Sequence, residues 1–498
     1  MILSELAAAA PDSVLQGAGD LDICGLAYDS RQVVPGDLFV ALRGSEVDGR
    51  RYAASAIEKG AVAVAAEGVA DSAWRTPFLK VPDSRRALAE LACAFHGNPS
   101  HDLRVAGVTG TNGKSTTAII AKHLLDAAQR RSGLIGTIGN DVGDGVQAGT
   151  HTTPESLELQ GLLSEMRENG CASAVMEVSS HGLDQDRVRG VRFRAAAFMN
   201  LTQDHLDFHG TMEAYFDAKR TLFEMTAEEG GLLVINGDDP YGRRLLDEFG
   251  KEARCLSFGS GFGNDLRVSN WRIGFDGTQF DLEAKGRSIL VKLPLIGRFN
   301  ISNALAALGL AEGCGCNFRE AVRGLATCPQ VPGRLENVSL DAPFRVFVDY
   351  AHTPDALTNV LAAVRGLNPR RLVTVFGCGG DRDREKRPLM AKAAEEGSDL
   401  CVLTSDNPRG EDPELILRDA ARGFRSKDHL QIVDRREAIR TAILKARPHD
   451  VVVVAGKGHE DYQEIDGVKQ PFNDRKICEG FVRESLDRGF RKDLKKED

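Results

Sequence analysis

The fold class expected of this chain follows from "GVTGTNGKST", residues 107 to 116. This stretch closes the strand-like run "LRVAGVTG" and precedes Lys114 to Gln129, where apolar residues recur with helical spacing. A glycine-rich turn between a strand and a helix can direct backbone N–H groups at an anion, and the positive end of the helix points to the same place. We therefore expect a loop that binds the phosphates of ATP or another nucleoside triphosphate.

Two kinds of side chain in this loop suit a nucleotide. Lys114 would supply a mobile positive charge, and the hydroxyl of Ser115 or Thr116 would reach Mg2+. The usual pattern G-x-x-x-x-G-K-[ST] needs glycine at position 108, where this chain has Val108, so the loop is shorter than in ordinary P-loop proteins. The alternative is a strand, turn and helix that bind no nucleotide.

Strand-like and helical runs alternate along the rest of the chain. The strand-like runs are "CASAVMEV" (171–178), "FRAAAFMNL" (193–201), "RVFVDY", "RLVTVFG", "LCVLTS" and "DVVVVAG". This alternation predicts parallel α/β sheets, whose ligands bind beyond the carboxyl ends of the strands.

The length of the chain and the positions of proline and glycine between predicted elements indicate three domains. At roughly 150 residues per domain, 498 residues correspond to about three. "HGNPSHDLRV" (96–105) and "TCPQVPGRLE" (327–336) interrupt helical patterns with proline and glycine. We expect domains at 1–98, 99–330 and 331–498.

Composition excludes several classes of function. The formal charge of -9 gives no basic field that would recruit nucleic acid or anionic lipid. The N-terminus lacks the charged region of a secretory signal, and no apolar run is long enough to span a membrane. Ten irregularly spaced cysteines, none in a C-x-x-C pair, indicate reduced thiols in the cytoplasm.

Two further stretches carry side chains suited to a metal ion. "MEVSSHGLDQDRV" places Glu177 at the end of a strand, as expected of a metal-binding carboxylate. "NLTQDHLDFHGTMEAYFDAKR" follows the next strand with His205 and His209, and it puts Lys219 on a predicted helix. The two histidines lie four residues apart but lack the H-E-x-x-H pattern of a zinc site. A solvated acidic loop is the other alternative.

Together these motifs resemble the Mur ligase family, ATP-dependent amide-forming enzymes of peptidoglycan precursor synthesis that also include the folylpolyglutamate synthetases. The resemblance implies that Lys114, His205 and Lys219 are catalytic, and that Lys219 carries a CO2-derived carbamate whose negative charge suits a metal ion. Mg2+ would be held by Ser115, Glu177, His205 and carbamylated Lys219. ATP would be bound by Gly110, Thr111, Asn112, Gly113, Lys114, Ser115, Thr116, Asn300, Arg334 and Asp349, of which the last three would contact adenine, phosphate and ribose.

The first domain is similar to the uridine-diphosphate region of the family members that extend UDP-N-acetylmuramoyl-L-Ala-D-Glu. The stretch that carries this likeness is "AYDSRQVVPGDLFVALRGSEVDGRRY" (27–52). By that likeness the uridine diphosphate would be held by Tyr28, Ser30, Ser45, Glu46 and Val47, and the sugar-peptide by His151, Thr152, Thr153, Ser179, Gln185 and Arg187. At position 151 an asparagine is also seen in the family.

The incoming amino acid would be selected in the last domain. "TSDNPRGEDP" contains Asp406, Asn407, Pro408 and Arg409, the form associated with meso-diaminopimelate rather than lysine. Diaminopimelate carries a second carboxylate that a guanidinium can hold by two hydrogen bonds, whereas lysine has none. By resemblance, Arg382 would be a second arginine of this site, and Gly456 and Glu460 would contact the distal amino group. A proline turn with an exposed arginine is the alternative.

We therefore expect a monomeric cytoplasmic ligase with three α/β domains: a uridine-nucleotide domain, a central parallel-sheet P-loop-type ATPase domain and a Rossmann-like C-terminal domain. It would use ATP and Mg2+ to add meso-2,6-diaminopimelate to UDP-N-acetylmuramoyl-L-Ala-D-Glu through an acyl phosphate. Asp and His residues between 204 and 209 are candidates for the base. The alternatives are a lysine-adding ligase, a folylpolyglutamate synthetase, and a P-loop nucleotide switch that makes no bond.

Overall fold

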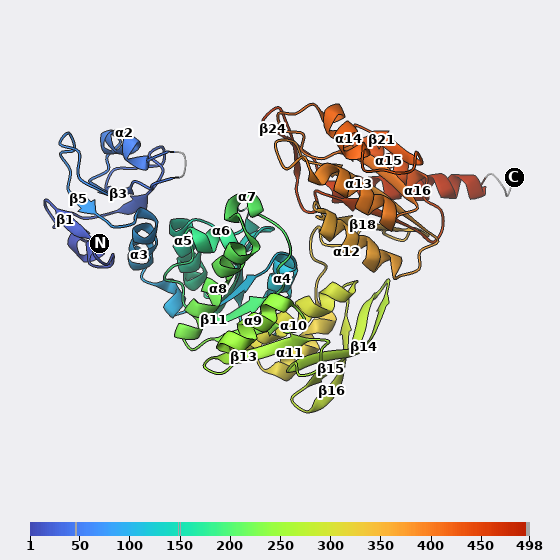
Figure 1. Ribbon diagram of the computed structural model, residues 1–498, viewed down its shortest axis with the longest axis horizontal. Helices are drawn as coiled ribbons and strands as arrows, with labels where there is room; N and C mark the ends of the chain where they lie inside the picture. Colours follow the sequence, from blue (N-terminus) through green and yellow to red (C-terminus); the bar gives the residue numbers. More distant parts are fainter. Residues whose placement is uncertain (45–46, 148, 150, 495–498) are drawn as a thin grey trace. The chain divides into compact units, whose positions relative to one another are not determined.

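The computed structural model describes residues 1–44, 47–147, 149 and 151–494, with the backbone alone for 488–494. It has three main sheets and one two-stranded hairpin, with helices packed on the sheets (Figure 1). The α/β class expected from the sequence is confirmed. The chain divides into two compact units, which consist of Met1–Val268, Leu282–Ser288 and Ser302–Leu325, and of Ser269–Asp281, Ile289–Ile301 and Ala326–Asp498.

The N-terminal part of the first unit is a five-stranded sheet in the order β1-β5-β4-β3-β2, parallel except for β1. Alternate residues of its strands face opposite ways: Leu38 and Val40 pack with helices α1 and α3, whereas Phe39 packs with α2. Both faces are therefore buried, as continuous apolar runs require. The elements are α1 (Leu3–Ala7), β1 (Val14–Gln16), β2 (Gly25–Ala27), β3 (Asp37–Val40), η1 (Gly49–Tyr52), α2 (Ala53–Glu58), β4 (Ala63–Ala66), β5 (Phe78–Lys80) and α3 (Ser84–Phe95).

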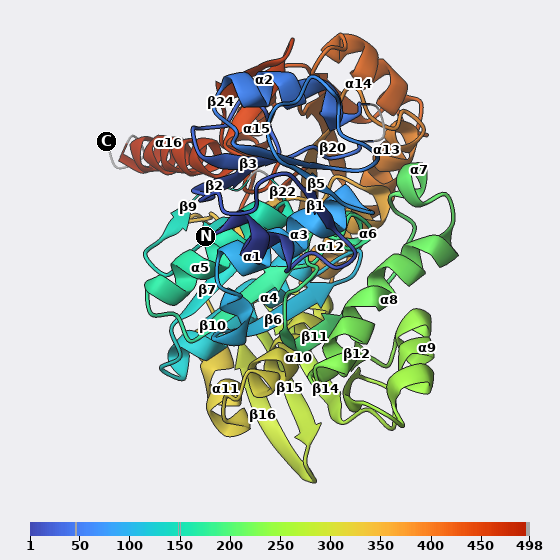
Figure 2. The same cartoon turned by 90° about the vertical axis from the view of Figure 1, so that its left-hand side faces the viewer.

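An eleven-stranded sheet follows, in the order β16-β15-β14-β13-β12-β11-β6-β10-β7-β8-β9. Strand β6 (Arg104–Thr109) pairs in parallel with β10 (Ser173–Glu177) and β11 (Phe193–Phe198), which flank it in Figure 2. The carboxyl ends of these three strands therefore lie at one edge of the sheet, and the phosphate loop leaves from that edge.

The other strands of this sheet are β7 (Ser132–Gly136), β8 (Gly139–Asp141), β9 (Val146–Gln147), β12 (Leu232–Asn236), β13 (Arg254–Gly259), β14 (Leu266–Gly274), β15 (Gly277–Ala284) and β16 (Arg287–Leu293). The helices of this part are η2 (Pro99–His101), α4 (Lys114–Ala127), α5 (Ser156–Glu168), α6 (Ser180–Asp184), α7 (Leu206–His209), α8 (Met212–Glu228), α9 (Pro240–Phe249), α10 (Arg298–Gly313), α11 (Phe318–Gly324) and η3 (Leu325–Thr327).

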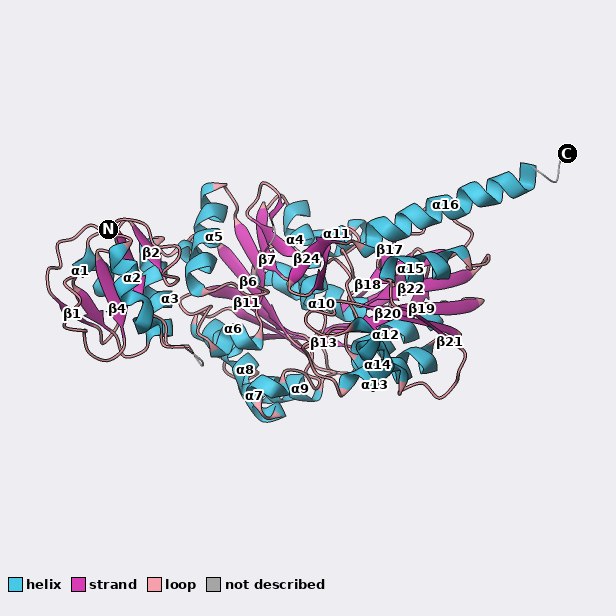
Figure 3. Cartoon of the chain, turned by 90° about the horizontal axis from the view of Figure 1, so that it is seen from above, coloured by secondary structure: helices cyan, strands magenta, loops and turns pink. Residues whose placement is uncertain are grey.

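The second unit contains a six-stranded sheet in the order β17-β18-β22-β19-β20-β21, parallel except for β17. Its two faces carry separate cores, one formed with α12, α13 and α14 and the other with α15 and α16. Figure 3 shows these two groups of helices on opposite sides of the sheet. The elements are β17 (Glu336–Asn337), β18 (Arg345–Asp349), α12 (Pro354–Arg365), β19 (Arg371–Cys378), α13 (Lys386–Gly397), β20 (Leu400–Ser405), α14 (Pro413–Ala421), β21 (His429–Ile432), α15 (Arg435–Leu444), β22 (Asp450–Ala455), β23 (Tyr462–Ile465), β24 (Val468–Pro471) and α16 (Asp474–Leu494).

Every strand-like run named from the sequence forms a strand, and the helix expected after the phosphate loop begins at Lys114. All ten thiols are free, as expected of reduced cysteines. In the part of the chain that the structure describes, no helix has the length and apolar character needed to cross a bilayer.

Candidate active site

The loop between β6 and α4 requires glycine at two positions. Gly110 has φ +148° and Gly113 has φ +90°. A Cβ on Gly110 would lie 2.8 Å from Cβ of Met199, and one on Gly113 would lie 2.5 Å from Oδ1 of Asn303. Neither site has room for a side chain, so the backbone can follow this turn only with glycine.

The loop is held from the neighbouring strand by Asn200, which follows β11. The backbone N–H of Asn112 donates to Oδ1 of Asn200 at 2.9 Å, and Nδ2 of Asn200 donates back to the carbonyl of Asn112 at 3.1 Å. The N–H of Thr111 donates to the carbonyl of Asn200 at 3.0 Å. These bonds hold the loop against the end of β11, a role that the sequence analysis missed although Asn200 lies within "FRAAAFMNL".

Lys114 is the first residue of α4, and its side chain folds back over the loop. Its Nζ donates to the carbonyl oxygens of Gly110 at 2.8 Å and Thr111 at 2.9 Å. The ammonium therefore lies beside the N-terminus of the helix, where the helix dipole also favours an anion. The structure places the predicted phosphate-binding groups together.

Ser115 and Glu177, two of the predicted metal ligands, are in contact. Glu177 ends β10, is 2% exposed, and accepts a hydrogen bond from Oγ of Ser115 at 3.0 Å. Thr137, which the sequence analysis missed, donates its N–H at 2.9 Å and its hydroxyl at 3.2 Å to the same carboxylate. The hydroxyl of Thr137 also lies 2.9 Å from that of Thr152.

Lys219 lies on α8 and is 1% exposed. Its Nζ donates to the carbonyl of Gly110 at 3.2 Å and lies 4.5 Å from the ring centroid of Tyr215. Burial lowers the pKa of Lys219 well below its usual value, and the charge of Lys114 lowers it further, although Asp204 opposes this. The neutral amine, which is the form that reacts with CO2, is therefore favoured.

His205 stands before α7 with its side chain 47% exposed, and its Nε2 lies 3.5 Å from a carboxylate oxygen of Asp204. Partial burial lowers its pKa, and the charges of Lys114 and Lys219 add to this effect, whereas Asp204 raises it. Its ring packs 4.8 Å from that of His181, another residue that the sequence analysis missed. Among the described residues, no three His, Cys, Asp or Glu side chains gather as a metal-binding group.

The residues predicted to hold the sugar-peptide mostly form one network. The hydroxyl of Thr153 donates to the carbonyl of Glu177 at 3.0 Å and accepts from the N–H of Ser179 at 2.9 Å. Arg187 donates to the carbonyl of Thr153 at 2.8 Å and to the side-chain oxygen of Gln185 at 2.7 Å. These four residues therefore form one hydrogen-bonded cluster beside Glu177. Thr152 reaches this region through its contact with Thr137, whereas His151 is exposed.

Three of the predicted uridine-nucleotide residues, Tyr28, Ser30 and Val47, lie in loops between the strands of the N-terminal sheet. The hydroxyl of Tyr28 donates to Glu158 of α5 at 2.5 Å, and burial and this carboxylate raise the pKa of Tyr28. The carbonyl of Ser30 accepts from Nζ of Lys59 at 3.0 Å, and Val47 is 41% exposed. Ser45 and Glu46 lie outside the described residues.

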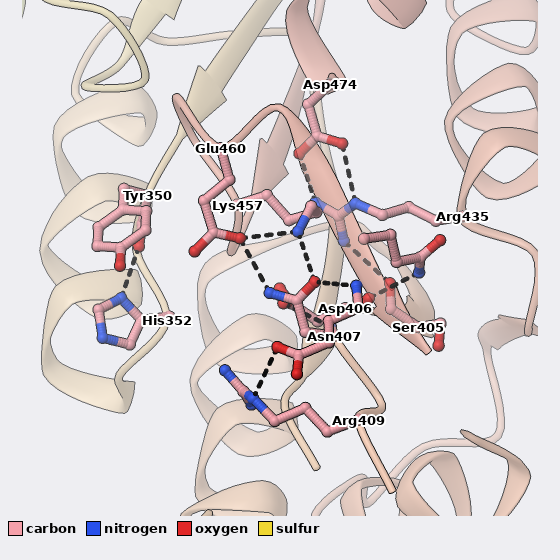
Figure 4. A network of polar contacts seen from close by, with 12 residues as sticks. Tyr350, His352, Ser405, Asp406, Asn407, Arg409, Arg435, Lys457, Glu460 and Asp474 are labelled. Carbon is pink, nitrogen blue, oxygen red and sulfur yellow. Dashed lines mark hydrogen bonds and ion pairs between the residues drawn. The ribbon is translucent and has the colours of Figure 1, made fainter. Parts of the chain in front are cut away.

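In the second unit, Asn407 is the centre of a polar network that we call the Asn407 network: Asn407, Arg409, Lys457, Glu460 and Glu464 (Figure 4). Asn407 is 2% exposed, and its Nδ2 donates to Oε2 of Glu460 at 2.9 Å. Its Oδ1 accepts from Nζ of Lys457 at 2.9 Å and from the N–H of Glu464 at 3.0 Å. The network joins the loop after β20 to the loop after β22.

Arg409 adopts an unusual backbone conformation, with φ +52°. Hairpin β23–β24 supports it, because the N–H of Arg409 donates to the carbonyl of Glu464 at 3.0 Å and its carbonyl accepts from the N–H of Asp466 at 2.7 Å. Its Nη1 donates to the carbonyl of Gly380 at 2.8 Å. Pro408 precedes it within the same loop, and the carbonyl of Pro408 accepts from the N–H of Glu411 at 3.0 Å.

Some residues that were predicted to contact the incoming amino acid lie outside the Asn407 network. Arg382 is exposed, and its Nη1 donates to the carbonyl of Asp381 at 3.5 Å. Gly456, with φ +118°, lies so close to Asp406 that a Cβ would approach its Oδ2 to 2.5 Å. Arg435 and Asp474, both fully buried, form a bidentate ion pair at 2.9 and 2.6 Å. Arg435 also donates to the carbonyls of Ser405 and Ala455, which end β20 and β22.

Asn300, Arg334 and Asp349, predicted to bind the nucleoside and a phosphate, belong to the second unit. Nδ2 of Asn300 donates to the carbonyl of Ile296 at 2.8 Å, and the guanidinium of Arg334 lies 4.7 Å from the ring centroid of Tyr350. Asp349 accepts from the N–H groups of Leu335 at 2.6 Å and Ala351 at 2.7 Å. Burial raises its pKa although Arg334 opposes this.

Three family models match this chain. The Mur ligase middle domain matches residues 108–311, which include the phosphate loop, Glu177, His205 and Lys219. The glutamate ligase domain of Mur ligases matches residues 333–458, and the catalytic domain of the Mur ligase family matches residues 22–96.

Similar proteins cover nearly the whole chain. A "UDP-N-acetylmuramoyl-L-alanyl-D-glutamate--2,6-diaminopimelate ligase" of Solibacter usitatus is 47% identical over 463 residues, which are 92% of this chain and 93% of that one. A protein of the same name from Syntrophomonas wolfei is 45% identical over 471 residues, 94% of this chain and 96% of that one. A solved structure with that name is 34% identical, covers 98% of this chain and 99% of its own, and aligns with a TM-score of 0.70. The chain belongs to the Mur ligase family.

Proposed function

We propose that this chain is an ATP-dependent ligase that joins meso-2,6-diaminopimelate to the D-Glu residue of UDP-N-acetylmuramoyl-L-Ala-D-Glu, a step of peptidoglycan precursor synthesis. The names of the relatives that cover more than nine-tenths of the chain support this reaction. The observation that carries it is the Asn407 network, which presents a guanidinium and a carboxylate, Arg409 and Glu460, in one connected set. Its charges suit the distal carboxylate and ammonium of diaminopimelate.

The reaction begins with transfer of the γ-phosphoryl group of ATP to the γ-carboxylate of D-Glu. Lys114 and the N-terminus of α4 neutralise the charge of the transferred group, and the backbone of Gly110 to Gly113 holds it in line. The amine of diaminopimelate then attacks the acyl phosphate, and phosphate leaves as the amide forms. The proton of the attacking amine goes to a base, for which Asp204, His205, Asp207 and His209 remain candidates.

The donor set at the end of β10 fits a hard cation. Glu177 and Ser115 present oxygen ligands in contact, and a carbamate on Lys219 would add another near Gly110. Mg2+ bound by Ser115, Glu177, His205 and carbamylated Lys219 would supply positive charge to the phosphates. The low pKa of Lys219 supports carbamylation, because only the neutral amine reacts with CO2.

The remaining assignments follow from the resemblance and the contacts. Thr152, Thr153, Ser179, Gln185 and Arg187 bind the sugar-peptide, with His151 beside them, and the uridine diphosphate lies at Tyr28, Ser30 and Ser45 to Val47. Asn300, Arg334 and Asp349 bind adenine, phosphate and ribose, and Asp406 to Arg409, Arg382, Gly456 and Glu460 bind diaminopimelate. We further propose a cytoplasmic monomer with domains at 1–98, 99–330 and 331–498.

The test is phosphate release from ATP in the presence of UDP-N-acetylmuramoyl-L-Ala-D-Glu and one of three additions: meso-diaminopimelate, lysine or buffer. We expect release to depend on diaminopimelate and to produce the extended peptide, detected by mass spectrometry. Preference for lysine would identify a lysine-adding ligase. Release without any amino acid and without a new amide would indicate a nucleotide switch.

Replacing Arg409 with Ala separates amino-acid recognition from nucleotide binding. We expect the KM for diaminopimelate to rise by an amount that corresponds to about 2 to 4 kcal/mol, with little change in the KM for ATP. The control is Arg418→Ala, which removes an exposed arginine of α14 that pairs with Glu414. Equal increases for both substrates in Arg409→Ala would contradict the assignment.

A further inference from the structure

Lys457, a member of the Asn407 network, has no role in the function proposed above. It is fully buried, and its Nζ donates to Oδ1 of Asn407 at 2.9 Å and to Oε2 of Glu460 at 2.8 Å (Figure 4). A buried ammonium is costly unless it is paired, and here both partners are residues predicted to bind the amino acid. Lys457 therefore supports Asn407 and Glu460 from their buried side.

The contacts of Lys457 determine how Asn407 is oriented. Nζ of Lys457 and the N–H of Glu464 can only donate, so the atom of the Asn407 amide that they contact must be the oxygen. The amide nitrogen must then face Glu460, to which it donates at 2.9 Å. One oxygen of Glu460 receives both the Lys457 and Asn407 bonds. Lys457 therefore orients two neighbouring residues at once.

Glu464 is the corresponding partner of Arg409. Its carboxylate oxygen lies 3.5 Å from Nε of Arg409, and the two side chains are 24% and 23% exposed. The opposite edge of the guanidinium is held by the carbonyl of Gly380, which accepts from Nη1 at 2.8 Å. Glu464 comes from hairpin β23–β24, which also supports the backbone of Arg409. The positive charge of Arg409 is thus paired with a negative charge from the same unit.

The network therefore contains two ion pairs with opposite arrangement. In one, the buried Lys457 pairs with the carboxylate of Glu460; in the other, the partly exposed Glu464 pairs with the guanidinium of Arg409. The four charges sum to zero. A ligand end that carries one carboxylate and one ammonium matches such a set, whereas an end that carries only an ammonium brings an uncompensated positive charge.

We propose that Lys457 and Glu464 are positioning residues that set the amino-acid specificity of the ligase by keeping this network neutral. The inference rests on the proposed function, because it takes the Asn407 network as the site for the distal end of diaminopimelate. Removing either charge changes the net charge of the site by one unit, in opposite directions. Loss of Lys457 makes the site acidic and favours a cationic end, and loss of Glu464 makes it basic and disfavours one.

The experiment measures kcat/KM for meso-diaminopimelate and for lysine with Lys457→Met, Glu464→Gln and the double variant. We expect the ratio of the two values to fall about tenfold in Lys457→Met, to rise severalfold in Glu464→Gln, and to return toward the wild-type ratio in the double variant. Because both amino acids are offered to the same preparation, an unfolded fraction lowers both rates equally and leaves the ratio unchanged. Substitution of a residue with only a structural role would leave the ratio of the two kcat/KM values unchanged.

The matched controls are Lys392→Met and Glu396→Gln, which remove the same charges from an exposed pair on α13. Their ratios should equal that of the wild type. If the ratio moves in the same direction in both network variants, or stays constant, the inference is overturned although the wild type still prefers diaminopimelate. A wild type that does not prefer diaminopimelate would instead overturn the proposed function itself.

Discussion

Two lysine amines approach the same carbonyl oxygen in this protein. Nζ of Lys114 lies 2.8 Å and Nζ of Lys219 lies 3.2 Å from the oxygen of Gly110. Two ammonium groups so close together repel each other, and the buried one loses its charge more easily because burial already penalises it. Under the proposed function the two lysines have different tasks: Lys114 would supply positive charge to the phosphate, and Lys219, whose pKa is lowered, would react as the neutral amine.

Lys114→Ala tests the first task. Without the ammonium, the charge that develops on the transferred phosphoryl group loses its nearest neutralising side chain, and we expect kcat to fall by about 10²- to 10³-fold or more. The measurement is ADP release with all three substrates. Lys122→Ala serves as the control, because Lys122 lies on the same helix but pairs with Asp126 and Asp141. Turnover close to that of the wild type in Lys114→Ala would reject the assignment.

Carbamylation of Lys219 can be observed without reference to activity. Protein equilibrated with 13C-bicarbonate at neutral pH should show a carbamate carbon signal by NMR that is absent from Lys219→Met. Since the amine must be neutral to react and protonation occurs as the pH falls through its lowered pKa, the signal should decrease toward acidic pH. Enzyme freed of CO2 should lose activity and regain it with bicarbonate. No lysine-dependent signal at neutral pH would contradict the prediction.

At the scale of elements, the loops that follow β19 and β20 are joined by ion pairs around Glu411. Its carboxylate accepts from Nη2 of Arg387 at 2.7 Å, from the N–H of Asp381 at 2.6 Å and from Arg384 at 2.9 Å. Arg387 comes from α13 and is fully buried. These contacts hold the loop that contains Arg382 against the loop that contains Arg409.

The contribution of Glu411 to the free energy of unfolding should depend on pH. Its hydrogen bond to Arg387 lowers the pKa of Glu411 from 4.5 to about 2. A carboxylate with a lowered pKa in the folded state contributes stability above pH 4.5, and that contribution is lost as the pH falls toward 2. Glu411→Gln should therefore lower the free energy of unfolding by about 1 to 3 kcal/mol at pH 7.

Urea denaturation at several pH values checks this expectation. The difference between the wild type and Glu411→Gln should narrow as the pH falls below 4.5, whereas Glu414→Gln, an exposed carboxylate on α14, should show little difference at any pH. A difference between the wild type and Glu411→Gln that is independent of pH would mean that the ion pair does not cause it.

At the scale of the whole molecule, the two compact units interleave along the chain. Ser269–Asp281 and Ile289–Ile301 belong to the second unit although they precede the boundary near residue 330 that the sequence predicts. Ile296, which is 6% exposed, lies in one core with Leu335 and Phe347. A segment before residue 330 therefore contributes to the packing of the C-terminal sheet.

Ile296→Ala should destabilise the second unit. Removing a buried isoleucine side chain costs about 2 to 4 kcal/mol, which is the lost transfer free energy plus the cavity that remains. Hydrogen exchange should accelerate at β18 and β22 more than at β6 and β10. The matched variant Ile235→Ala, in the core of the first unit, should show the reverse pattern. Equal acceleration in both units by both variants would indicate that they unfold as one.

The elements and the phosphate loop could be predicted because their signals are local. A buried parallel strand is a short apolar run, so "DVVVVAG" predicts β22, and a glycine turn before a helix predicts the loop at Gly110. Asn200, Thr137, His181, Lys457 and Glu464 were missed. Each acts through a partner far away in the sequence, and single polar residues after strands are too common to indicate a site.

Local patterns in the amino-acid sequence predict the α/β class, the strands, the phosphate loop and the family to which the chain belongs, because these depend on residue types at short and regular spacing. Which polar groups meet depends on the tertiary fold: Ser115 contacts Glu177, Lys219 contacts the carbonyl of Gly110, and Lys457 contacts Asn407 and Glu460. Such contacts arise when the carboxyl ends of strands distant in the sequence are brought to one edge of a sheet, where burial lowers the dielectric constant and makes each pairing matter.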